Sequence, residues 1–134
     1  MSEKYVPTFT LNDGVEVPAV GLGTWKLRGD DAVTAVRSAI DIGYRHIDTA
    51  ALYRNEADIG RAIRDAISAG DVTREELFIT SKVWNDQQSD QEVQAAFRTS
   101  LTNLGLDYLD CYMVHWPCPS TDYEIGRASC RERV

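Results

Sequence analysis

Hydrophobic residues recur along the chain with two different periods. Three segments repeat apolar residues every three or four positions, which predicts amphipathic helices. Asp30 and Asp31 can cap the first helix and Asn55 the second, while Ser89 opens the third with Glu92 completing a capping box. A glycine follows each segment and can end it. The predicted apolar faces are Val33, Val36, Ala39 and Ile40; Ile59, Ala62, Ile63, Ala66 and Ile67; and Val93, Ala96, Phe97, Leu101 and Leu104.

Short apolar runs alternate with these helices and predict β-strands. Residues 9–17 read FTLNDGVEV, where alternating residues flank an Asp-Gly pair, a strong signal for a hairpin. Four brief strands follow, at residues 19–22, 45–48, 77–81 and 108–114. Strands that alternate with amphipathic helices imply a parallel α/β sheet with right-handed crossovers. This order fits an open doubly wound sheet or the first half of a (β/α)8 TIM barrel, which needs about 250 residues.

The last ten residues break this pattern. Ile125–Val134 reads IGRASCRERV, is rich in arginine and has neither a helical nor a strand period. It resembles one reading frame of a common sequencing-library adapter. We therefore interpret residues 1–124 as the N-terminal part of a barrel and residues 125–134 as a non-native tail.

Composition narrows the classes of partner. With 43% hydrophobic and 26% charged residues, the chain can bury a sizeable core. A net charge of -7 argues against nucleic acid, and no stretch approaches the roughly 20 apolar residues that span a bilayer. The three cysteines, Cys111, Cys118 and Cys130, suggest no disulfide scaffold, and the histidines and cysteines lack zinc spacing. We expect a cytoplasmic protein that binds neither membrane nor metal.

Chemically versatile residues follow the predicted strands where those strands end. In parallel α/β folds, ligands bind at the carboxyl ends of the strands, so these residues should share one rim. They include an Asp, a Tyr, a Lys, a His and all three tryptophans. In chain order, the rim residues are Thr24, Trp25 and Lys26; Asp48, Thr49, Ala50 and Tyr53; Lys82 and Trp84; and His115 and Trp116.

This set of groups suits proton transfer to a carbonyl. Free tyrosine has a pKa of about 10 and donates poorly at neutral pH, but a nearby ammonium favours its phenolate. Lys82 can supply the ammonium and Asp48 can hold it in place, which makes Tyr53 a usable general acid. His115 can orient the carbonyl oxygen. None of these groups is redox-active, so a hydride must come from a cofactor.

Each residue alone also has an ordinary structural interpretation. Asp48 can cap a turn, Tyr53 can be half-buried packing, Lys82 can be a solvated charge and the tryptophans can belong to the core. The convergence of the four polar residues on one rim favours the chemical interpretation. The Gly-Leu-Gly run at residues 21–23 lacks the third glycine of a dinucleotide-binding turn. His46 should point away from the rim or lie beneath it.

Several ordered motifs resemble the aldo-keto reductase family. GYRHIDTA at residues 43–50, followed by Glu56, Ile59 and Gly60, is similar to the family signature. GLGTWK at 21–26, ITSKVWN at 79–85 and VHWP at 114–117 resemble the family at the same relative places. The resemblance covers about residues 5–124 and is nearest to bacterial 2,5-diketo-gluconate reductases and related small-aldehyde reductases.

The resemblance implies a role for each rim residue. Tyr53 would donate the proton, Lys82 would assist it while paired to Asp48, and His115 would orient the substrate carbonyl. Binding of the nicotinamide end of NADPH would involve Thr24, Trp25 and Asp48. The substrate pocket would be lined by Trp25, Trp84, His115 and Trp116. The preference for NADPH over NADH rests on the family alone, as does the expectation of a monomer.

The leading hypothesis is an NADPH-dependent oxidoreductase that reduces aldehydes, ketones or sugar carbonyls to alcohols. One alternative is a non-catalytic protein of the same fold that binds the cofactor to sense redox state. Another is a truncated, inactive fragment, because half a barrel leaves sheet edges unpaired and apolar strand faces uncovered.

Overall fold

Helices and strands alternate along the chain after an N-terminal hairpin. A computed structural model describes residues 6–87, 89–117 and 129–130. Three α-helices and two short 3-10 helices occur there: α1 (Gly29–Asp41), α2 (Glu56–Ser68), α3 (Asp90–Leu104), η1 (Ala51–Tyr53) and η2 (Arg74–Glu76). The strands are β1 (Thr8–Thr10), β2 (Glu16–Pro18), β3 (Leu22–Gly23), β4 (His46–Asp48), β5 (Phe78–Val83), β6 (Cys111–Val114) and β7 (Ser129–Cys130).

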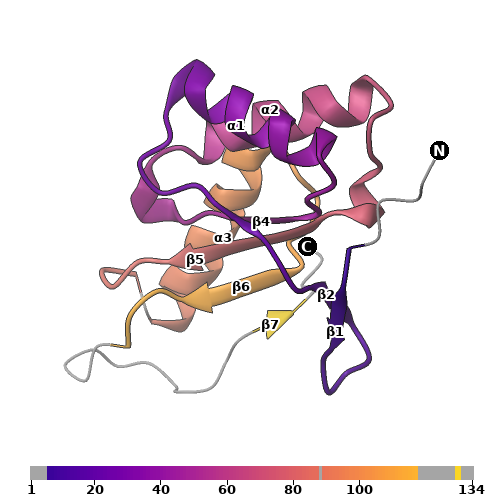
Figure 1. Ribbon diagram of the computed structural model, residues 1–134. Helices are drawn as coiled ribbons and strands as arrows, with labels where there is room; N and C mark the ends of the chain where they lie inside the picture. The colour runs from indigo at the N-terminus through magenta and orange to yellow at the C-terminus, as the bar shows by residue number, and fades with distance from the viewer. Residues whose placement is uncertain (1–5, 88, 118–128, 131–134) are drawn as a thin grey trace.

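The main sheet keeps the order of the sequence. Strands β3, β4, β5 and β6 lie side by side in that order and all pair in parallel. Helix α1 packs against α2, and α2 packs against α3, so the helices follow the same order as the strands (Figure 1). A doubly wound sheet reverses its strand order and carries helices on both faces. The sequential order therefore favours the barrel among the two predicted architectures.

The side chains of strand β5 alternate between the two faces of the sheet. Ile79 and Val83 are buried in the core that the sheet forms with the helices, and Ser81 on the same face bonds to α2. Thr80 and Lys82 alternate with them and bond to side chains of β4. This period of two places the core on one face of the sheet and the polar groups on the other. The core comprises Ala32, Val36, Ile40, Ile47, Ile59, Ala62, Ile63, Ala66, Val72, Leu77, Ile79, Val83, Ala96, Phe97, Leu101, Leu104, Leu109 and Tyr112.

Helix starts were predicted with mixed success. The capping box of α3 is confirmed, since the Glu92 carboxylate accepts from the Ser89 backbone N–H at 3.1 Å and from its hydroxyl at 2.6 Å. The caps predicted for α1 are wrong, because Arg28 holds the N-cap position and Asp30 and Asp31 lie in the first turn. Carboxylates in the first turn interact favourably with the positive end of the helix dipole, although they do not cap the helix. No helix in the described ranges is long and apolar enough to cross a membrane.

Strand boundaries shift by a few residues from the prediction. The hairpin forms as expected, with Gly14 at a φ of +83° in its turn. Strand β6 begins at Cys111 instead of residue 108, because the preceding Asp110 turns its carboxylate to the Ile79 backbone N–H at 2.9 Å. Strand β5 extends two residues further than predicted, to Val83, which pairs with Val114.

Gly60 allows α2 to approach the end of α3. A Cβ atom at this position would lie only 2.2 Å from the Leu104 backbone oxygen. Arg64, one turn further along α2, donates to the same oxygen at 2.6 Å. A residue without a side chain is therefore required where the two helices meet.

Strand β7 pairs antiparallel with β6, through Cys111 and Tyr112. Residues 129–130 fall within the segment that we interpreted as a non-native tail. Most of that segment, and Cys118, lie outside the described residues, so the proposed division at residue 124 stays a prediction.

Candidate active site

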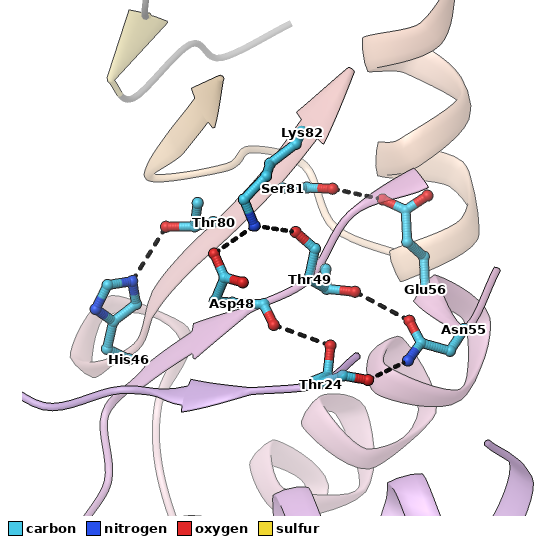
Figure 2. Close-up of polar contacts among 9 residues, drawn as sticks. All are labelled: Thr24, His46, Asp48, Thr49, Asn55, Glu56, Thr80, Ser81 and Lys82. Carbon is cyan, nitrogen blue, oxygen red and sulfur yellow. Dashed lines mark hydrogen bonds and ion pairs between the residues drawn. The ribbon is translucent and has the colours of Figure 1, made fainter. Parts of the chain in front are cut away.

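An ion pair between neighbouring strands forms the centre of the candidate site. The Lys82 Nζ atom on β5 lies 2.6 Å from Asp48 Oδ1 at the end of β4 (Figure 2). The same ammonium donates to the Thr49 backbone oxygen at 3.1 Å. The Lys82 side chain is 13% exposed and that of Asp48 32% exposed, so the pair is partly shielded from water. The two partners that the sequence assigned to each other are thus in contact.

Tyr53 and His115 stand beside this ion pair. The Lys82 Nζ atom lies 5.4 Å from the centre of the Tyr53 ring. The rings of Tyr53 and His115 are 5.7 Å apart, centre to centre, and nearly perpendicular. Tyr53 ends η1, and Arg54 after it adopts a left-handed φ of +55°. The structure therefore brings together all four residues predicted to be catalytic.

The surroundings of His115 lower the pKa of its ring. Burial, and next the Lys82 ammonium, lower the pKa of His115 below its usual value, while Asp48 opposes this shift. Its Nδ1 atom is buried and finds no hydrogen-bond partner among the described residues. A lowered pKa favours the neutral ring at neutral pH, and a neutral imidazole carries one N–H donor and one acceptor.

Two of the three tryptophans form an aromatic cluster with His115. The Trp84 ring centre lies 5.2 Å from that of His115 and 5.0 Å from that of Trp116. Trp116 is 59% exposed. Trp25, on the loop after β3, is 66% exposed, and the Lys26 ammonium lies 4.6 Å from its ring centre. Exposed indole rings at strand ends provide apolar surface at the rim.

Thr24 ties the first parallel strand to the second. It is fully buried, and both its backbone N–H and its hydroxyl donate to the Asp48 backbone oxygen, at 3.1 Å and 2.9 Å. Its hydroxyl is thus already used within the protein. The predicted role of Thr24 in cofactor binding stays a prediction.

Sequence reasoning missed two residues at the start of α2. Asn55 holds the predicted N-cap position, but its side chain makes no capping hydrogen bond and bonds instead to neighbouring segments. Glu56 is 4% exposed and accepts from the Ser81 hydroxyl at 2.8 Å. The sequence pattern predicts only a helix cap for Asn55, and Glu56 enters it only as part of a motif. Neither residue carries a sequence signal that distinguishes a buried bridge from a helix start.

His46 lies beneath the ion pair, which is one of the two positions that the sequence predicts for it. Its Nε2 atom is 3.1 Å from the Thr80 hydroxyl, and its ring meets Phe78 edge-on at 4.9 Å. Burial is the largest cause that lowers the pKa of His46, whereas the Pro18 carbonyl and Asp48 oppose it. His46 is therefore a structural residue below the rim.

A lowered histidine pKa predicts a loss of stability in acid. The unfolded chain has a histidine pKa of about 6.5, so below that pH it takes up a proton before the folded chain does. The free energy of unfolding should fall between about pH 6.5 and the lower pKa of the folded state, and then level off. Urea unfolding of the protein with a complete barrel, near neutral pH and in mild acid, should show a smaller fall in the free energy of unfolding for His46→Gln than for wild type. Equal falls would contradict this assignment. His115, whose pKa is also lowered, should leave a residual pH dependence in the variant.

Two further features of the described residues bear on the location of the site. Within the parts of the chain that the structure describes, no group of three His, Cys, Asp or Glu side chains could hold a metal ion. A pocket of about 510 Å³ lies between the hairpin and the start of β5, and includes Glu16, Arg45 and Phe78. This pocket lies at the end of the sheet opposite to Lys82 and contains none of the predicted site residues.

Comparison with known proteins decides the family. The sequence pattern of the Aldo/keto reductase family matches residues 19–132. The chain belongs to this family. The matched range contains Asp48 and Lys82 of the ion pair and their neighbours Tyr53 and His115, and the predicted family resemblance is confirmed.

Bacterial oxidoreductases are among the similar curated proteins. The chain is 52% identical over 120 residues to the uncharacterized oxidoreductase YtbE of Bacillus subtilis, covering 89% of this chain and 43% of that protein. It is 45% identical over 115 residues to DkgA of Salmonella typhi, covering 86% of this chain and 40% of that protein. The chain thus spans about two fifths of the length of these relatives.

Solved aldo/keto reductase structures confirm the fold class. An aldo-keto reductase of Bombyx mori, crystallised in complex with NADP, superposes with a TM-score of 0.80 at 47% identity. The superposition covers 84% of this chain and 38% of that structure. The α/β chain with its parallel sheet and three helices therefore corresponds to the N-terminal part of an aldo/keto reductase barrel.

Proposed function

We propose that the protein carrying this chain reduces aldehydes, ketones or sugar carbonyls to alcohols, with NADPH as the hydride donor. The observation that carries the proposal is the contact of Lys82 with Asp48 at 2.6 Å, beside the rings of Tyr53 and His115. Such a set can deliver a proton to a carbonyl oxygen and hold that oxygen in place. Because the chain spans about two fifths of its relatives, the proposal concerns the protein of full family length.

We further propose that the loop after β3 and the end of β4 hold the nicotinamide end of the cofactor. The Thr24 hydroxyl donates to the Asp48 backbone oxygen, which joins the ends of β3 and β4. The Trp25 indole, next to Thr24 in the chain, is 66% exposed. We assign Thr24, Trp25 and Asp48 to the nicotinamide side. When bound, NADPH would supply the hydride, which no side chain of this chain can supply.

Tyr53 is the proposed general acid. As its proton passes to the carbonyl oxygen, negative charge develops on the phenol oxygen. The Lys82 ammonium near the ring stabilises that charge, and Asp48 with the Thr49 carbonyl keeps the ammonium in place. Because the site is partly shielded from water, these charges interact more strongly than they would in bulk solvent.

His115 and the tryptophans select and orient the substrate. A neutral His115 ring can donate a hydrogen bond to the carbonyl oxygen without competing with Tyr53 as a strong acid. Trp84 and Trp116 meet that ring edge-on, and Trp25 lies on the loop after β3. Apolar walls of this kind exclude water and favour small substrates with hydrophobic surface.

The proposal predicts NADPH-dependent turnover. The family-length protein, mixed with NADPH and a panel of aldehydes, ketones and sugars, should consume NADPH only when a carbonyl is present. The same panel with NADH measures the cofactor preference. Tight NADPH binding without turnover of any carbonyl would favour the cofactor-sensing alternative instead.

A further inference from the structure

One buried amide joins the loops that carry the proposed site residues. Asn55 is 1% exposed. Its Nδ2 atom donates to the backbone oxygens of Thr24, at 2.7 Å, and Leu27, at 2.9 Å. Its Oδ1 atom accepts from the Thr49 hydroxyl at 3.1 Å (Figure 2). Two carbonyl acceptors require the NH2 group on that side, so both ends of the amide are matched.

The first loop held by Asn55 is the one proposed to face the cofactor. Thr24 and Leu27 flank Trp25 and Lys26, and Lys26 adopts a left-handed φ of +67°. A non-glycine residue in this conformation persists where its surroundings hold it. The two hydrogen bonds from Asn55 fix the backbone on both sides of that residue.

The second segment held by Asn55 carries Tyr53 and contacts Lys82 of β5. Thr49 donates its hydroxyl to Asn55 and uses its backbone oxygen to accept from Lys82. Tyr53 lies two residues before Asn55, separated from it by Arg54 in a left-handed conformation. The side chain of Asn55 therefore lies between the loop after β3 and the segment that carries Tyr53 and binds Lys82 through the Thr49 carbonyl.

Carbonyl reduction makes the relative position of these two segments decisive. The carbonyl carbon must receive a hydride from the cofactor side while its oxygen receives a proton from Tyr53. A misplacement of about 1 Å between reacting groups can cost on the order of a hundredfold in rate. A residue that sets this separation affects turnover without touching the substrate.

We propose that Asn55 is a positioning residue for carbonyl reduction, which holds the loop of Trp25 in register with Tyr53 and Lys82. This inference rests on the proposed function. The position of Asn55 at the start of α2 would also suit a helix cap, but its side chain makes no capping hydrogen bond. Its hydrogen bonds go to the site loops instead.

The test compares Asn55→Ala with Asp110→Ala in the family-length protein. Asp110 is 3% exposed and accepts from the Ile79 backbone N–H and from Arg74, at the other end of β5. Both variants delete a buried hydrogen-bonding side chain, so both should lower the urea midpoint. Three quantities are measured: kcat for an aldehyde, the NADPH Kd from quenching of tryptophan fluorescence, and the urea midpoint.

Asn55→Ala is expected to lower kcat about tenfold to a hundredfold and to weaken NADPH binding. Asp110→Ala should keep the wild-type kcat and Kd despite its lower stability. If Asn55→Ala fails to fold, the kinetics of Thr49→Val test the inference instead. This variant removes one hydrogen bond to Asn55 and keeps the backbone oxygen that accepts from Lys82. A smaller loss of kcat in Thr49→Val supports the inference.

If Asn55→Ala folds and keeps the wild-type kcat and Kd, this inference is overturned and the proposed function is not affected. If Asn55→Ala does not fold, the same result in Thr49→Val overturns the inference. Equal kinetic losses in Asn55→Ala and Asp110→Ala would also overturn it, because they would indicate a general effect of stability. A wild-type protein that neither binds NADPH nor reduces a carbonyl would instead refute the proposed function, and this inference with it.

Discussion

Tyr53→Phe is expected to lower kcat for carbonyl reduction by about 10²–10⁴ while leaving NADPH binding intact. The variant removes the only acidic proton of the ring and keeps its apolar body next to His115. The hydride donor would remain bound, but the carbonyl oxygen would gain no proton from the protein. Steady-state rates with an aldehyde, and the NADPH Kd from fluorescence, measure the two effects separately.

Tyr108→Phe provides a matched control for this experiment. Tyr108 packs against the Arg74 guanidinium, 3.9 Å from its ring centre, before the start of β6. Loss of its hydroxyl should leave kcat unchanged. If Tyr53→Phe turned over as fast as Tyr108→Phe, another group would have to serve as the general acid.

The 134-residue chain by itself is expected to be poorly soluble and to unfold without a cooperative transition. Among the described strands, β3 pairs on one side only, with β4. Met113 and Cys111, on the face of the sheet opposite the helices, are only partly buried. Unpaired edges and uncovered apolar faces favour association over a unique fold. Thermal unfolding followed by near-ultraviolet circular dichroism, with dye binding to exposed apolar surface, tests this expectation.

The family-length protein is the reference for that comparison and should melt sharply. A sharp melt of the 134-residue chain together with tight NADPH binding would contradict the expectation. It would mean that residues beyond this chain are needed neither for folding nor for holding the cofactor.

The order of elements was predictable because local patterns determine it. The three helices have clear apolar stripes, and the hairpin has its Asp-Gly turn, so all were found at nearly the right positions. Strand ends were less predictable. The start of β6 depends on the contact of Asp110 with Ile79, which is 31 positions distant in the chain and leaves no local signal.

The candidate site was predictable for a topological reason. Parallel strands place their carboxyl ends at one edge, so Asp48 and Lys82 could be assigned to each other before their contact was known. The bridge made by Asn55 could not be predicted, because an asparagine before a helix suggests a cap. The need for Gly60 was also hidden, since it arises from the approach of Leu104 on another helix.

The alternation of side chains along β5 limits how this protein can change during evolution. A shift of the strand by one position would bury the Lys82 ammonium among apolar side chains and present Val83 at the proposed active site. A one-residue insertion or deletion inside the strand would therefore abolish both stability and chemistry at once. The hairpin turn between β1 and β2, where Asn12 and Asp13 face solvent, can absorb such changes in length. Length variation among descendants of this chain should accumulate in that turn, while β5 keeps its length.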